Sequence, residues 1–304
     1  MFPGQAVTVA GPLTKPLKTR STEHIFEALG RVARKYNPNS DLVERVLGDN
    51  PDVQLTPAEL QASLCATSVA KAKLAEEKGI KCDLCMGDSA GEGSMLPYAG
   101  IVSSVEQAID LMYQRGKHTG ECKPKDEKPT EKVSSNLVVI VKAPLGLIEE
   151  AIARTPKELG YAGINKINPG QQMGITGNIP ALDYAVNYLI SKGIPERYCI
   201  SVPVDSPVHS PLMKPAEEKM REVVGNMKFN PPSKPVIMMY SGKQETDPNR
   251  IKDCFTSLIS TPANLDRGID AATKIGIRKF IVATVCRVFP KLLKRRKDVE
   301  VIED

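Results

Sequence analysis

The chain has 304 residues, of which 41% are hydrophobic and 25% are charged, and its formal net charge is +5. This composition is typical of a globular enzyme and excludes a disordered or fibrous chain. The length allows one large domain with a smaller domain inserted into it as readily as two domains in tandem. No run of about 18 apolar residues occurs, and the N-terminus lacks a basic segment followed by an apolar one, so we expect neither a membrane span nor a secretory signal.

The helices and strands of the first part of the chain follow from local patterns. At Thr56 the sequence Thr-Pro-Ala-Glu predicts a capped helix that runs to Gly79. A strand over residues 80–86, a tight turn over 87–91 and a helix over 92–97 come next. Ser103 begins a further helix that carries Arg115 near its end. These patterns predict a strand, turn and helix unit flanked by two long helices.

A boundary is predicted at residues 123–135, which are rich in Lys, Glu and Pro and have the character of a mobile linker. Beyond it, residues 135–204 have the order βαββαβ, which is typical of a ferredoxin-like subdomain. The predicted strands cover 136–142, 161–167, 171–176 and 198–204, and the predicted helices cover 145–159 and 181–192. Residues 1–134 and 205–304 would then form the second unit, and the apolar runs at 235–240 and 279–285 would add strands to its sheet. The expected class is α/β.

The seven cysteines and the positive charges indicate no specialised chemistry. An odd number of cysteines scattered over a long chain suits a reducing compartment. Cys82 and Cys85 form a lone Cys-x-x-Cys, but no second pair or neighbouring histidine completes a site, so we predict no metal and place both in a buried strand. The densest positive cluster, Lys291 to Lys297, is explained equally well by a solvated helix end. We therefore expect no nucleic acid partner and no membrane partner.

A candidate nucleophile is Ser89, in a Gly-x-Ser-x-Gly sequence on the predicted strand-to-helix turn. Small flanking residues let the backbone bend sharply and expose the hydroxyl. The backbone N–H of Ala90, at the start of the following helix, is a natural donor to a developing oxyanion. The alternative is a glycine-rich turn that contains a serine by chance.

A serine nucleophile needs a base, and the chain has only three histidines. His24 and His118 lie in polar segments and are most simply surface residues. His209 follows an apolar strand in a loop stiffened by Pro207 and Pro211, and loops at strand ends commonly carry catalytic groups. The alternative for His209 is a structural histidine.

Four segments together resemble the malonyl-CoA:acyl carrier protein transacylases, in the same order and at similar separations. They are the opening Phe-Pro-Gly-Gln at residues 2–5, the turn 87–92, the Asn-Pro-Gly-Gln at 168–171 and the loop 207–213. The similarity also takes in residues 60–62, 111–116 and 287–295, so it covers essentially the whole chain. The family architecture is a hydrolase-like α/β domain with a parallel sheet, interrupted by a ferredoxin-like subdomain.

The resemblance implies a role for each matching position. It makes Ser89 the nucleophile and His209 its base, with the main-chain carbonyl of Leu258 orienting the imidazole. It makes the backbone N–H groups of Gln5 and Ala90 the oxyanion hole and Gln61 a residue that lines the pocket. Arg115 would bind the free carboxylate of the malonyl group. A planar, two-pronged guanidinium suits that carboxylate better than lysine does.

The implied reaction transfers a malonyl group from malonyl-CoA to the phosphopantetheine thiol of acyl carrier protein through a malonyl-serine intermediate. It needs no bound cofactor. Acyl carrier protein is the expected partner of a monomeric enzyme in the cytoplasm, or in the matrix of a mitochondrion or plastid. The product would feed fatty acid or polyketide synthesis.

Three departures from the family pattern bear on this reading. Asp88 replaces a usual histidine and places a negative charge beside a site that must bind an anion. Val208 replaces a usual phenylalanine, and the smaller side chain would widen the pocket for a methyl-branched acyl group. The strand that leads into the Phe-Pro-Gly-Gln turn in the family would precede Met1, which a truncated N-terminus would explain.

Two other functions remain open from the sequence. A serine esterase or thioesterase of the α/β-hydrolase type would share the turn around Ser89, but it would have no use for Arg115 or for the inserted subdomain. A catalytically impaired relative that binds the carrier protein is the second alternative, and the altered positions beside Ser89 and His209 favour it.

Overall fold

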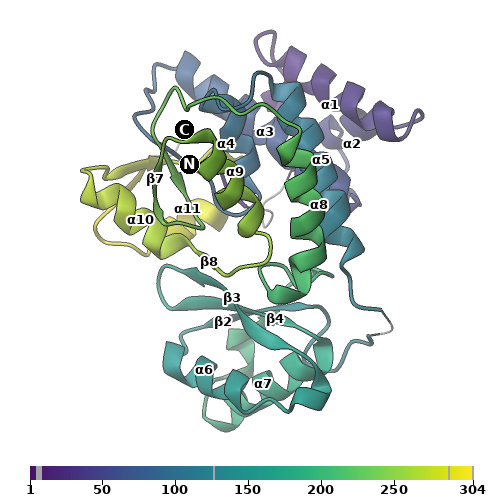
Figure 1. The fold of residues 1–304 in the computed structure, drawn as a ribbon, viewed down its shortest axis with the longest axis vertical. Coiled ribbons are helices and arrows are strands. Elements are labelled where there is room, and N and C mark those ends of the chain that lie inside the picture. The colour runs from purple at the N-terminus through teal and green to yellow at the C-terminus, as the bar shows by residue number, and fades with distance from the viewer. Residues whose placement is uncertain (5–8, 126, 287, 303–304) are drawn as a thin grey trace.

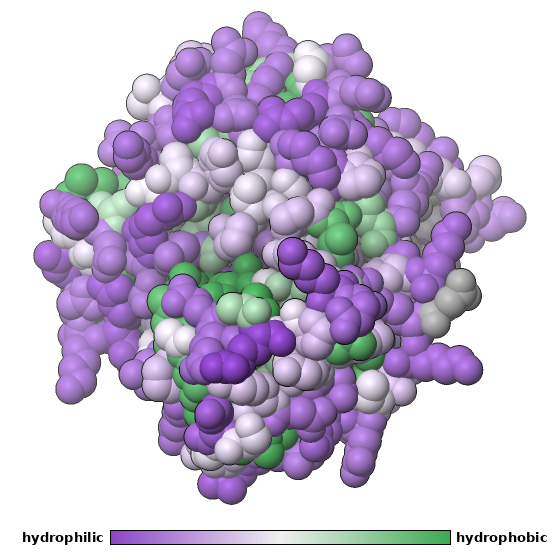
Figure 2. Space-filling view, turned by 60° about the horizontal axis from the view of Figure 1, so that its bottom comes forward, coloured by the Kyte–Doolittle hydropathy of each residue, from purple (hydrophilic) through white to green (hydrophobic). Residues whose placement is uncertain are grey.

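The computed structural model describes residues 1–4, 9–125, 127–286 and 288–302. Its elements form a larger unit of helices and short strands, with a smaller unit below it in Figure 1. None of the helices in these ranges is both long and apolar enough to span a bilayer. Figure 2 shows the molecule turned so that the smaller unit comes forward, and hydrophilic residues dominate this face.

The larger unit is built mainly from helices around a three-stranded sheet. Its helices are α1 (Glu23–Tyr36), α2 (Leu42–Leu47), α3 (Pro57–Glu77), α4 (Gly91–Tyr98), α5 (Val105–Glu121), α8 (Lys214–Gly225), α9 (Pro248–Ser257), α10 (Leu265–Lys274) and α11 (Val288–Leu293). Its strands are β1 (Cys85–Met86), β6 (Val236–Met238), β7 (Lys243–Glu245), β9 (Lys279–Ile281) and β10 (Glu300–Ile302). The sheet has the order β1-β6-β7, in which β1 and β6 are parallel and β7 is antiparallel to β6.

The predicted helix cap at Thr56 is confirmed. Its side chain accepts a hydrogen bond from the Glu59 N–H, and the Glu59 carboxylate accepts one from the Thr56 N–H, which makes a complete capping box. The cap fixes the start of α3. Most residues of this helix are buried, so it runs through the main hydrophobic core. The second long helix, α5, is capped by Ser104 and not by Ser103, since the Ser104 hydroxyl accepts from the Gln107 N–H.

Two strand predictions for this unit were wrong in extent or in pairing. The strand expected over 80–86 is only two residues long, because Lys81 and Asp83 are exposed and the ladder begins at Cys85. Cys85 is therefore buried in a strand as predicted, whereas Cys82 is half-buried and outside it. β9 pairs in parallel with β10 in a separate two-stranded sheet and does not join β1 or β6 directly. Among the described residues, no group of three metal-ligating side chains occurs.

The smaller unit has the predicted order βαββαβ. Its elements are β2 (Leu137–Val141), α6 (Leu145–Ala153), β3 (Ala162–Asn168), β4 (Gln172–Gly177), α7 (Ile179–Ser191) and β5 (Cys199–Ser201). The strands lie in the order β5-β2-β4-β3, with each neighbouring pair antiparallel, which is the ferredoxin-like arrangement. Apolar side chains of α6 and α7 pack on one face of this sheet, and Figure 1 shows both helices on the side away from the larger unit.

A strand from the larger unit extends this sheet. β8 (Ala263–Asn264) pairs in parallel with β3, where Lys166 lies opposite Ala263 and Ile167 opposite Asn264. The predicted mobile linker between α5 and β2 is held against the smaller unit by several side chains. Glu127 accepts hydrogen bonds from Asn136 at 2.8 Å and from Asn178 at 2.6 Å, and Lys132 donates one to Asn187 at 2.6 Å. The two units therefore share backbone hydrogen bonds at β3, and this places the side chains of β3 next to the larger unit.

Candidate active site

Ser89 lies on the tight turn between β1 and α4, as predicted. Its φ is +54°, in the left-handed region that a serine rarely adopts. Neither Gly87 nor Gly91 could carry a side chain. A Cβ on Gly87 would lie 2.3 Å from the backbone nitrogen of Glu92, and a Cβ on Gly91 would lie 2.3 Å from the backbone oxygen of Phe2. The two glycines thus let α4 begin directly behind the serine, and Ala90 is the N-cap of that helix. Its N–H belongs to the helix end whose donors have no partner within the helix.

His209 lies beside Ser89 although 120 positions separate them in the chain. The distance from Ser89 Oγ to His209 Nε2 is 2.6 Å, and His209 Nδ1 is 2.6 Å from the carbonyl oxygen of Leu258. Because a carbonyl oxygen only accepts, Nδ1 carries the proton and Nε2 has a free lone pair directed at the serine hydroxyl. The His209 backbone N–H also donates to the Ile259 carbonyl at 3.1 Å. The imidazole is therefore held in the tautomer that a general base requires.

Burial keeps this imidazole neutral. His209 is 4% exposed, and desolvation, with further contributions from the positive charges of Arg115 and Lys166, lowers its pKa from 6.5 to about 4. The Leu258 carbonyl and Asp88 oppose this shift. A base that is neutral at physiological pH can accept the serine proton without first losing one of its own.

Leu258 itself is the C-cap of α9, so its carbonyl belongs to a helix end that lacks partners within the helix. The hydrogen bond to His209 satisfies this carbonyl and orients the ring at the same time. No acidic side chain is needed for that purpose.

Arg115 is a buried guanidinium on α5, with only 4% exposure. Its Nη1 donates to Gln61 Oε1 at 2.7 Å, and Gln61 Nε2 in turn donates to Thr119 Oγ1 at 3.3 Å. Within the described part of the chain, Arg115 Nε has no hydrogen-bond partner. Desolvation lowers the pKa of Arg115 to about 10, so the group stays positively charged at neutral pH. The positive charge of Arg115 is therefore close enough to lower the pKa of His209, and its Nε–H remains available to donate a hydrogen bond.

The same site carries further charged residues, whose partners are not evident from the sequence. Lys166 of β3 reaches across from the smaller unit, and its Nζ lies 2.6 Å from Asp88 Oδ2. Glu92 on α4 is fully buried and accepts a hydrogen bond from the Met239 N–H at 2.6 Å. Desolvation raises the pKa of Glu92 to about 8, so this carboxyl is mostly protonated at neutral pH. The site therefore contains two cations and one ionised carboxylate.

Comparisons with known proteins find similar sequences and similar folds. A scan against protein-family models finds no match. The chain is nevertheless 26% identical over 305 residues to the malonyl CoA-acyl carrier protein transacylase of Bacillus subtilis, which covers 97% of this chain and 89% of that protein. The crystal structure of an acyl carrier protein S-malonyltransferase from Vibrio cholerae matches all of this chain and 95% of its own, with 25% identity and a TM-score of 0.85.

The resemblance to the malonyl-CoA:acyl carrier protein transacylases is confirmed in sequence and in fold. A third match is a malonyl-transacylase solved in complex with a type II PKS acyl-carrier protein, with 25% identity, a TM-score of 0.86 and coverage of 100% of this chain and 94% of that one. The α/β class that the sequence predicted is confirmed by the same comparisons.

The transacylase resemblance assigned seven site residues, and the structure describes six of them. It brings together Ser89, His209 and Leu258 by hydrogen bonds and links Arg115 to Gln61. Ala90 stands next to Ser89 at the start of α4. Gln5 lies outside the described residues. Glu92 and Lys166 were missed as site residues, because burial and contacts between distant segments leave no local signal in the sequence.

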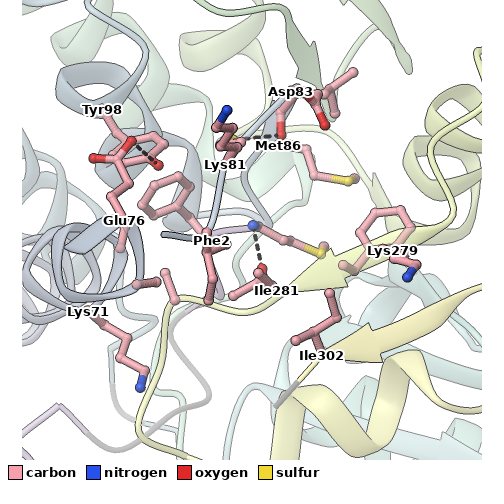
Figure 3. A pocket seen from close by; sticks show the side chains of 18 of the residues that line it. Phe2, Lys71, Glu76, Lys81, Asp83, Met86, Tyr98, Lys279, Ile281 and Ile302 are labelled. Atoms are coloured by element: carbon pink, nitrogen blue, oxygen red, sulfur yellow. Dashed lines mark hydrogen bonds between the residues drawn. The ribbon is translucent and has the colours of Figure 1, made fainter. Parts of the chain in front are cut away.

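The structure also contains a separate cavity. It has a volume of about 370 Å³, and neither Ser89, His209 nor Arg115 lines it. Figure 3 shows its walls, with Glu76 and Tyr98 hydrogen-bonded to each other on one side and Lys279, Ile281 and Ile302 on the other. Phe2 lies between the two walls. The hydrogen-bonded pair of Ser89 and His209, and not this cavity, marks the candidate active site.

Proposed function

We propose that this chain is an acyltransferase that moves a malonyl group from malonyl-CoA to the phosphopantetheine thiol of acyl carrier protein. The observation that carries the proposal is the continuous contact from the Ser89 hydroxyl through His209 to the Leu258 carbonyl, next to the buried positive charge of Arg115. The likeness to the named transacylases over nearly the whole chain supports it.

In the first half-reaction, His209 Nε2 takes the proton of the Ser89 hydroxyl while Oγ attacks the thioester carbonyl carbon. The negative charge that develops on the carbonyl oxygen is stabilised by the backbone N–H of Ala90, and the family resemblance assigns the second donor to Gln5. Each such donor is worth about 3 kcal/mol. As the intermediate collapses, the bond from carbon to sulfur breaks and the departing CoA thiol takes the proton from the imidazolium. A malonyl ester on Ser89 remains.

In the second half-reaction, the carrier thiol gives its proton to His209 and its sulfur attacks the ester. The Ser89 oxygen leaves and recovers the proton from His209, so the enzyme returns to its starting state. Throughout both halves Arg115 binds the free carboxylate of the malonyl group by charge-assisted hydrogen bonds, and Gln61 holds the guanidinium in place.

We also propose acyl carrier protein as the protein partner, because a solved relative is a malonyl-transacylase in complex with a type II PKS acyl-carrier protein. The reaction as written needs no bound cofactor. The seven cysteines, none of which forms a disulfide, support a reducing compartment such as the cytoplasm or an organelle matrix. The monomeric state that the resemblance implies stays a prediction.

Changing Arg115 to alanine tests the substrate assignment. We expect kcat/KM for malonyl-CoA to fall about 100-fold, because a charge-assisted hydrogen bond to the acyl carboxylate is lost, while acetyl-CoA loses little. Arg115→Lys keeps the charge without the two-pronged geometry and should give an intermediate loss. The assay follows malonyl and acetyl transfer to carrier protein together with release of free acid. Equal losses for both acyl groups would contradict the role of Arg115, and release of malonate as fast as CoA would favour a thioesterase.

The pH dependence tests the state of His209. An imidazole with an ordinary pKa of 6.5 would be mostly protonated at pH 5.5, and kcat/KM would fall about tenfold from its value at pH 7.5. Because burial lowers the pKa of His209 to about 4, we expect kcat/KM to change by less than about twofold between these pH values. Initial rates in buffers of constant ionic strength, with far-UV circular dichroism to confirm folding, measure this. A tenfold loss would show that the imidazole is not desolvated.

A further inference from the structure

The residue before the nucleophile carries a buried carboxylate. Asp88 is 1% exposed, and its Oδ1 has no hydrogen-bond partner among the described residues. A Cβ on Gly4 would lie 2.8 Å from Oδ2, so the carboxylate is packed tightly against the backbone there. An uncompensated charge in such a place is costly, and its field acts on neighbouring groups with little screening.

The positive charge that compensates Asp88 comes from Lys166 of the smaller unit. Lys166 Nζ lies 2.6 Å from Asp88 Oδ2, and the lysine side chain is 21% exposed. Its backbone is held between Gly174 of β4 and Ala263 of β8. The lysine is therefore fixed by the sheet of the smaller unit, at the point where β8 joins that sheet to the larger unit.

The balance of charge at the site depends on this pair. Arg115 and Lys166 are positive and Asp88 is negative, while Glu92 and His209 are mainly neutral at physiological pH because both are buried. The site thus has one net positive charge, which matches one acyl carboxylate. Without Lys166, Asp88 would cancel Arg115 and would repel the acyl carboxylate.

We propose that Lys166 is a specificity residue that neutralises Asp88 beside the nucleophile and thereby lets the site accept an acyl group that carries a carboxylate. The inference rests on the proposed transfer reaction and deepens it. The preference for an anionic acyl group then depends on both units, since Arg115 belongs to the larger unit and Lys166 to the smaller one.

The test compares malonyl and acetyl transfer by four variants in the same assay. For Lys166→Met we expect kcat/KM for malonyl-CoA to fall about 10- to 100-fold and that for acetyl-CoA less than about threefold, since only the anionic acyl group meets the bare carboxylate. Lys166→Arg should stay close to the wild-type value, because it restores the charge. Asp88→Asn combined with Lys166→Met should recover malonyl transfer to within about threefold of wild type.

Asp88→Asn alone keeps the proposal open to refutation if Lys166→Met does not fold. This variant leaves the lysine unpaired, so the preference for malonyl over acetyl should hold or rise, and a fall would overturn the proposal. Equal losses of malonyl and acetyl transfer in Lys166→Met would overturn the proposal, and so would a folded double variant that does not recover malonyl transfer. Either result would mean that the pair of Asp88 and Lys166 has only a structural role. Failure of the wild-type protein to transfer malonyl at all would instead overturn the proposed function, and this inference with it.

Discussion

Replacing Ser89 by alanine is expected to lower malonyl transfer by at least about 10^4-fold, to the background of the assay. The Ser89 hydroxyl lies 2.6 Å from the His209 lone pair and is the proposed nucleophile, so without it no covalent intermediate forms. The substitution removes one oxygen atom from a turn whose backbone is fixed by Gly87 and Gly91, so the fold should be unaffected. Transfer to carrier protein measures the loss.

The exposed Ser103 supplies a matched control for this variant. Its hydroxyl donates to Gln107 Oε1 at 2.8 Å, and Ser103→Ala should keep wild-type rates. Binding of malonyl-CoA to the Ser89→Ala protein should also persist, because Arg115 and Gln61 are unchanged. Transfer above about one hundredth of the wild-type rate would show that another group is the nucleophile.

Replacing His209 by alanine should lower kcat/KM by about 10^3- to 10^4-fold, because Ser89 loses its base. The double variant Ser89→Ala/His209→Ala should be no slower than the slower single variant, since the two residues act as a unit. Added imidazole should restore part of the activity of His209→Ala. Single-turnover release of CoA measures the first half-reaction directly.

The substitution at 209 also leaves the buried Leu258 carbonyl without its partner, which costs about 1–3 kcal/mol of stability. Rates are therefore compared below the thermal transition, which is measured by circular dichroism for each variant. His24→Ala is the control, because this histidine is exposed on α1. Multiplicative losses in the double variant would mean that Ser89 and His209 act independently.

Features with a local chemical cause could be predicted from the sequence. The helix cap at Thr56 needs only residues three positions apart, and the turn at Ser89 needs only its two flanking glycines. The order βαββαβ followed from alternating strand and helix patterns, and it fixed the class of the smaller unit. His209 stood out because the chain has so few histidines. Leu258 came from the family resemblance, since a main-chain carbonyl has no signature of its own.

Features that depend on contacts between distant segments could not be predicted. Lys166 and Asp88 are 78 positions apart, and neither sequence neighbourhood indicates the other. β8 is two residues long, which is too short for any periodic pattern. The sequence shows Asp88 as a negative charge beside an anion-binding site, and the structure adds that this charge is paired with Lys166. Glu92 has an ordinary helical sequence context, and only its burial raises its pKa.

Mapping the covalent intermediate tests the central claim most directly. The protein is mixed with malonyl-CoA in the absence of carrier protein, quenched in acid, digested and sequenced by tandem mass spectrometry. We expect one malonyl ester, on the peptide that contains Ser89, and its disappearance when carrier protein with a phosphopantetheine thiol is added before quenching. A modified peptide that lacks Ser89, or CoA release with no modified peptide at all, would contradict the account.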